Sequence, residues 1–160
     1  MSIFNKYLLL ITTLIILVSC GGESVYFEKN NQINNKTWAI DDKQEFDFTV
    51  SDTTQFYDFF FNVRTTSNYE YSNMYVFYKL YFPNGKSLTD TAQFVLADPT
   101  GKWLGKSVSG SLIENSILFS TKRRFHFEGK YTFSVQHGMR NNALNEVSDV
   151  GFKIKEHKQK

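Results

Sequence analysis

The sequence predicts an all-β domain, an antiparallel β-sandwich of jelly-roll type with about eight strands. Apolar and polar residues alternate with a period of two from Trp38 onward, and turn residues separate the alternating segments. Several segments are apolar on both faces, which is typical of one sheet packed on another. With 160 residues, of which 41% are hydrophobic and 17% aromatic, the chain is long enough for one domain with a sizeable core.

The N-terminus predicts a lipoprotein signal peptide over residues 1–19. Lys6 supplies a positive charge, and the apolar run over residues 7–18 is shorter than the roughly 20 residues that span a bilayer. Leu17-Val18-Ser19-Cys20 resembles a bacterial lipobox, in which the chain is cut before the cysteine and its thiol is acylated. The alternative is an ordinary secretory signal followed by a free thiol. We expect Cys20 to be the lipid anchor.

The charge balance limits the classes of partner. The chain has 18 Lys and Arg against 16 Asp and Glu, so it lacks the excess of basic residues that phosphate neutralisation requires. We therefore expect no nucleic-acid partner, and attachment to the membrane through lipid rather than through charge. Cys20 is the one cysteine of the sequence, which excludes an intrachain disulfide.

Residues 20–36 predict a lipid-anchored tether. Glycines and four asparagines give this stretch a composition that resists packing. Val25-Tyr26-Phe27 leaves open a first edge strand within it, because three strand-favouring residues in a row are unusual in a linker. The β-sandwich domain is expected over residues 37–155, followed by a polar tail over residues 156–160.

Four strands are predicted in the first half of this domain. Residues 46–50 and 57–63 alternate Phe, Tyr or Val with mostly polar residues. Residues 74–82 and 88–96 form a hairpin, since Pro83-Asn84-Gly85-Lys86 fixes one φ angle and tolerates a positive one. Asp98-Pro99-Thr100-Gly101 then predicts a type I turn.

The second half repeats the pattern. Strands are predicted over residues 111–119, 123–127, 131–136 and 149–155, and Glu128-Gly129-Lys130 joins the second of these to the third. A helical period is confined to residues 141–147.

The sequence contains no recognisable set of catalytic residues. The three histidines lack the spacing of metal ligands, and no Gly-x-Ser-x-Gly elbow is present. Carboxylates such as Asp41, Asp42 and Asp98 could serve glycoside hydrolysis or hold calcium in a loop, but each is more simply a turn or surface residue. We expect no enzyme activity, no metal and no cofactor.

Three stretches carry more specific patterns. They are an arginine, Arg64, followed by the Tyr69-x-Tyr71 loop, then Gly101-Lys102-Trp103-Leu104-Gly105, then Gly138-Met139-Arg140. In this order behind a lipobox, they resemble the GldH family of gliding-motility lipoproteins of the Bacteroidetes, from Cys20 to about residue 155. The resemblance implies an outer-membrane lipoprotein of the gliding apparatus, linked to type IX secretion and without catalytic activity. Cys20 lacks the following acidic run that accompanies surface export in that phylum, which favours the periplasmic face.

Six residues are candidates for binding a partner: Arg64, Tyr69, Tyr71, Trp103, Met139 and Arg140. Trp103 could be an exposed anchor or a core side chain, and we expect a largely structural role. Arg64 and Arg140 could bind a partner carboxylate bidentately, or one of them could pair internally with Asp90 or Asp149, and for arginines at strand ends we favour the internal role. Arg140 is the better interface candidate, since loops on a rigid sheet scaffold carry specificity.

Two functions are compatible with these features. The first is a non-enzymatic subunit that binds other gliding or secretion lipoproteins of the envelope and steadies their assembly. The alternative is a carbohydrate-binding lipoprotein, because jelly-roll domains often bind glycans on aromatic surfaces.

Overall fold

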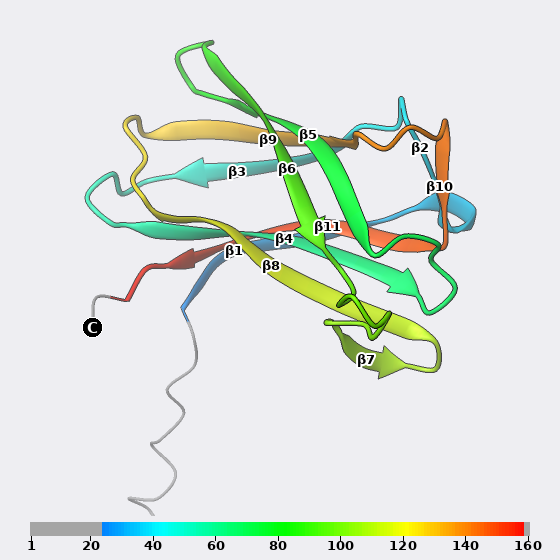
Figure 1. Cartoon of the computed structure of the whole chain (residues 1–160). Coiled ribbons are helices and arrows are strands. Elements are labelled where there is room, and N and C mark those ends of the chain that lie inside the picture. The colour runs from blue at the N-terminus through cyan, green and yellow to red at the C-terminus, as the bar shows by residue number, and fades with distance from the viewer. Residues whose placement is uncertain (1–23, 159–160) are drawn as a thin grey trace, which may run out of the picture.

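Two antiparallel β-sheets pack face to face in the computed structural model, which describes residues 24–158 (Figure 1). The lower sheet has the strand order β1 (Val25–Gln32), β11 (Val147–Glu156), β4 (Tyr57–Thr66), β8 (Leu112–Arg123) and β7 (Lys106–Ser109). The upper sheet has the order β3 (Gln44–Val50), β9 (Gly129–His137), β5 (Asn73–Tyr81) and β6 (Ser87–Val95). A third sheet joins β10 (Ala143–Asn145) to β2 (Thr37–Ala39), beside a short 3-10 turn, η2 (Asn34–Lys36).

The predicted jelly roll is confirmed, although the strand count was too low. Leaving out the short strands β2, β7 and β10, the first strand pairs with the eighth, the eighth with the third and the third with the sixth. The second strand pairs with the seventh, the seventh with the fourth and the fourth with the fifth, which completes the jelly-roll order. Eleven strands, rather than about eight, lie in the described residues.

The first strand corrects the predicted tether. β1 pairs with β11 from Val25, opposite Lys155, to Gln32, opposite Asp149. Tyr26 and Phe27 pack against the core, where the Phe27 ring lies 5.4 Å from that of Phe48, whereas Val25 is exposed. Residues 25–36 are therefore part of the folded domain, and their polar composition reflects an edge strand whose other side chains face water. The predicted leader over residues 1–19 and Cys20 lie outside the described residues.

Two other predicted segments are different in the structure. The strand predicted over residues 123–127 is absent, because β8 ends at Arg123 and the chain then crosses from the lower sheet to the upper one (Figure 1). Phe125 is buried at this crossing, and the Tyr131 hydroxyl fixes it by donating to the carbonyl of Phe127 at 2.8 Å. The helical period over residues 141–147 belongs to β10 and the loops beside it, not to a helix.

Both predicted turns are present. Gly85 N–H donates to the Phe82 carbonyl at 3.1 Å, and Gly85 has a φ of 77°, which glycine adopts without strain. In the second turn Gly101 N–H donates to the Asp98 carbonyl at 2.9 Å, and the Asp98 carboxylate accepts from the backbone of Thr100 at 2.8 Å.

Aromatic rings fill the space between the sheets. Phe133 of the upper sheet stacks on Phe152 of the lower one with centroids 4.1 Å apart, and Phe61 stacks on Phe94 at 4.5 Å. Such pairs each add about 0.5–1.5 kcal/mol beyond the burial of their area. The many phenylalanines of the sequence are thus mostly core residues.

On its outer face, the lower sheet carries a row of polar side chains across neighbouring strands. Asn62 of β4 donates to Glu28 of β1 at 2.9 Å and accepts from Ser116 of β8 at 2.7 Å. Gly151 of β11 lies between them, and the Asn30 side chain occupies the place that a Cβ atom on Gly151 would take. The glycine therefore lets β1 and its asparagine lie close against β11.

The described residues contain no helix of the length and apolarity needed to cross a bilayer.

Candidate functional site

The structure gathers most of the predicted partner-binding residues at one end of the sandwich. The Tyr69 ring lies 5.7 Å from that of Tyr71 and 6.5 Å from that of Trp103. The Asn141 side chain, next to Arg140, donates to the Tyr71 hydroxyl at 2.8 Å. Three stretches that are far apart in the sequence thus meet here.

The aromatic part of this end is largely structural. Tyr69 is 4% exposed, and burial raises the pKa of its hydroxyl. Trp103 is half-buried, packs against the core and forms an isolated bridge with Ala97. Tyr69 therefore cannot offer its ring to a partner, which corrects its place among the contact residues, whereas Tyr71 stays half-buried at the margin.

Arg64 lies on the outer face of the lower sheet and has an internal partner. Its Nη2 atom is 2.7 Å from Oδ1 of Asp149, which faces it from β11. Asp149 is one of the two carboxylates that the sequence suggested, while Asp90 instead accepts from the Tyr78 hydroxyl. The pair holds the ends of β4 and β11 together, so Arg64 does not present a free guanidinium.

The half-buried Met139 and the exposed Arg140 lie beside an exposed row of aromatic residues. Tyr75, Phe77 and Tyr81 lie on the outer face of β5, each at least 40% exposed, and we call them the β5 stripe. The Phe77 ring lies over Gly138, where an added Cβ would be 3.0 Å from it. Met139 Sδ accepts from the Tyr75 N–H at 3.3 Å, so the turn lies directly against the stripe.

Arg140 is the exposed charge beside this stripe. Its side chain makes no hydrogen bond or ion pair with other described residues, in contrast to Arg64. Tyrosine, phenylalanine, methionine and arginine are the residue types that interfaces favour. The β5 stripe with Met139 and Arg140, called the β5 surface below, can therefore contact a partner without rearrangement of the core.

Sequence reasoning did not single out Phe77 and Tyr81. Both faces of their strand are apolar, so the alternation alone does not show which face is outward. The nearby Gly138 indicates that another group lies close to the backbone. The sequence does not show that this group is Phe77, because only the fold brings β9 beside β5.

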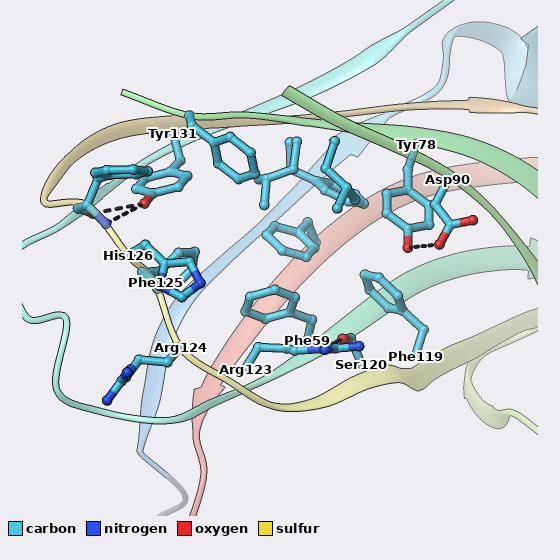
Figure 2. A pocket seen from close by; sticks show the side chains of 16 residues that line it. Phe59, Tyr78, Asp90, Phe119, Ser120, Arg123, Arg124, Phe125, His126 and Tyr131 are labelled. Carbon is cyan, nitrogen blue, oxygen red and sulfur yellow. Dashed lines mark hydrogen bonds between the residues drawn. The ribbon is translucent and has the colours of Figure 1, made fainter. Parts of the chain in front are cut away.

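A second candidate site is a cavity of about 320 Å³ between the sheets (Figure 2). Nine aromatic side chains and two leucines line it, and its polar lining consists of Asp90, Ser120, Arg123, Arg124 and His126. Arg123 Nε donates to Ser120 Oγ at 2.8 Å, and the Arg124 side chain points away from the aromatic lining in Figure 2. No group of three or more potential metal ligands occurs in the part of the chain that the structure describes.

A family model described as GldH lipoprotein matches residues 25–154, from the first residue of β1 into β11. The chain belongs to the GldH lipoprotein family. This confirms the family that the three sequence stretches suggested, and the matched range coincides with the jelly roll.

Two relatives of the GldH family cover nearly the whole chain. The chain is 33% identical over 151 residues to a gliding motility lipoprotein GldH homolog of Christiangramia forsetii, covering 90% of this chain and 91% of the relative. It is 30% identical over 163 residues to gliding motility lipoprotein GldH of Flavobacterium johnsoniae, covering 98% and 99%. Among solved structures, dimeric latent PorU from Porphyromonas gingivalis aligns with 87% of this chain and 14% of its own, at 8% identity and a TM-score of 0.34. That likeness is too weak to bear on the function.

Proposed function

We propose that this chain is an outer-membrane lipoprotein of the gliding-motility apparatus, linked to type IX secretion, and that it acts as a non-enzymatic binding subunit. Acylated Cys20 anchors it on the periplasmic face. Its partners are other gliding or secretion lipoproteins of the envelope. The names of its two GldH relatives support the motility role.

The β5 surface carries the binding part of this proposal. A soluble domain rarely keeps a row of exposed aromatic rings unless they serve contact. Arg140 adds an unpaired guanidinium that can bind a carboxylate bidentately. The rings lie on a regular strand in the middle of the upper sheet, between β6 and β9, so the surface is preformed and little order is lost on binding.

An Arg140→Ala variant tests the binding role. The Arg140 side chain makes no hydrogen bond or ion pair with the described residues, so the variant should fold like the parent, while capture of stoichiometric protein partners from crosslinked envelopes should fall about tenfold or more. Lys106→Ala, an exposed change on β7 in the other sheet, is the matched control and should capture normally. A folded Arg140→Ala protein that captures its partners and supports full gliding would contradict the proposal.

Retention of the parent on polysaccharide resin, without protein partners, would favour the carbohydrate-binding alternative.

The anchor is tested separately. Mass spectrometry of the purified N-terminus should find cleavage before Cys20 and an acylated thiol. Protease added to intact cells should leave the domain uncut if it lies on the periplasmic face, and should cut it once the outer membrane is permeabilised. An unmodified Cys20 would refute the anchor, and digestion in intact cells would refute the periplasmic face.

A further inference from the structure

We propose that the cavity between the two sheets binds a single fatty acyl chain that carries an anionic head. The cavity lies where the sandwich is not closed by strand pairing. β6 pairs with β5 alone, and β7 covers β8 only at Leu112, Ile113 and Glu114. The rest of β8 therefore faces β6 without backbone hydrogen bonds between them, and side chains of both strands line the opening.

The walls suit a ligand body without polar groups. The two lining tyrosines have partners of their own, since Tyr131 donates to the Phe127 carbonyl and Tyr78 donates to Asp90. The other rings of the wall are phenylalanines, apart from the exposed imidazole of His126, so most of the interior offers neither donors nor acceptors to a sugar or a nucleotide. An alkyl chain needs no hydrogen-bond donors or acceptors.

The exposed apolar residues at the edge of the cavity and the volume of the cavity also favour an acyl chain. Leu88 and Phe127 border the cavity at 49% and 44% exposure, which leaves apolar surface in water that a chain passing the lip would cover. The volume of about 320 Å³ is at the small end of ligand cavities, which range over roughly 300–1,000 Å³. It suits one acyl chain rather than two.

The charged side chains at the rim of the cavity are mainly basic. Arg123 and Arg124 are exposed, and neither has a carboxylate partner among the described residues. Arg123 uses Nε on a neutral serine, and the Arg124 guanidinium lies 5.9 Å from the centre of the Phe56 ring. The lining contains one carboxylate, Asp90, which is already bonded to Tyr78. The Arg123 guanidinium beside the apolar cavity, with that of Arg124 on the adjacent residue, complements a carboxylate or phosphate head.

The position of the rim favours lipid as the source. Arg123 pairs with Tyr57 at the same end of the lower sheet as Val25, which lies opposite Lys155. Four residues separate Cys20 from Val25, so the chain between them reaches at most about 18 Å. If Cys20 is acylated as proposed above, the rim lies near the membrane surface. The chemistry of the cavity does not depend on that anchor.

Binding is tested with the mature chain carrying Cys20→Ser, which has no lipid of its own. Saturated fatty acids of increasing length should bind with affinity rising roughly fourfold per methylene until the cavity is filled. An alkyl trimethylammonium of equal length should bind at least tenfold more weakly, and Arg123→Gln with Arg124→Gln should weaken the fatty acid while leaving the neutral alcohol unchanged. Equal affinity for the cationic and anionic probes, or no binding of any chain, would overturn the proposal.

A second variant guards against a fold defect. Leu88→Trp fills the lip at an exposed position and should weaken fatty acid binding tenfold or more, whereas Val95→Trp, on the outer face of the same strand, should not. Unchanged binding by Leu88→Trp would exclude this cavity. Vesicles containing phosphatidylglycerol distinguish the source, because transfer of lipid from them shows a bilayer lipid and binding of the free acid alone shows a fatty acid. Partner capture by Arg140 is independent of these results.

Discussion

At the scale of the residue, His137 shows how the core constrains one side chain. It is 0% exposed, and its ring lies edge-on to Trp38 with centroids 5.4 Å apart. Neither ring nitrogen has a hydrogen bond of normal geometry to the described residues. Burial lowers the pKa of His137, and the backbone of Trp38 offsets this only in part. Burial therefore favours the neutral imidazole in the folded protein.

This neutral histidine predicts loss of stability in mild acid. The unfolded chain protonates His137 below its ordinary pKa of about 6.5, while the folded chain does so only at lower pH, so stability is present above pH 6.5 and falls as the pH drops. Urea unfolding between pH 7.5 and 5.5 should show a slope of up to about 1.4 kcal/mol per pH unit. His137→Phe keeps a ring against Trp38 and should remove this slope; an identical slope in the variant would show that other groups cause it.

Trp103 makes a second prediction at this scale. Because it is half-buried against Tyr69, Trp103→Ala should lower the free energy of unfolding by about 2 kcal/mol, less than the 3–5 kcal/mol of a fully buried tryptophan. Partner capture should persist when assayed well below the melting temperature. Unchanged thermal stability combined with lost capture would instead make Trp103 an interface anchor.

At the scale of the element, Gly151 determines how closely β1 can pair. An added Cβ would lie 1.8 Å from Oδ1 of Asn30 and 2.9 Å from the carbonyl oxygen of Lys29. Gly151→Ala should therefore push β1 away from β11, speed amide exchange in β1 and cost about 1–3 kcal/mol of stability.

The control for this prediction is a double variant. Asn30→Ala removes the nearest atom, so Gly151→Ala combined with Asn30→Ala should recover part of the exchange protection of β1. Protection in Gly151→Ala equal to that of the parent would show that the strand adapts without cost. Deuterium uptake measured by mass spectrometry over residues 25–32 distinguishes these outcomes.

The strands that the sequence predicted are those whose apolar side chains alternate over five or more residues. β1 was only suggested because its outward side chains are polar, and β2, β7 and β10 are too short to show a period. The false strand over residues 123–127 has the right alternation, but its inward Phe125 serves a crossing between sheets. The local alternation of apolar residues indicates which side chains are buried. It does not indicate which segments form backbone hydrogen bonds with another strand.

The same limit applies to the candidate sites. An arginine at a turn could be named as an interface candidate from the sequence, and Arg140 is exposed in the structure. The cavity could not, because Phe119 and Tyr131 show the same inward alternation as side chains that fill the core. Whether the space between two rings is filled depends on the distance between strands, which no single strand specifies.

At the scale of the whole molecule, the domain begins twelve residues earlier than residue 37, the start expected from the sequence. A fragment starting at residue 24 should unfold in one cooperative transition. A fragment starting at residue 37 loses Phe27, whose ring packs on Phe48 and Phe152, and should be less stable by at least about 3 kcal/mol. Near-UV circular dichroism during urea unfolding measures the cooperativity and the stability of the two fragments. Equal midpoints would show that β1 is dispensable for stability.

The place of β11 between β1 and β4 also sets the order in which the protein can fold. The first strand of the jelly roll pairs with the last, residue 25 opposite residue 155, so the lower sheet has no centre until the C-terminal strand is available. Sheets made from such distant segments form in milliseconds to seconds rather than microseconds. If the leader expected over residues 1–19 starts export before synthesis ends, the translocation channel receives β1 before its partner strand has been made. The topology then delays folding until the last strand has arrived.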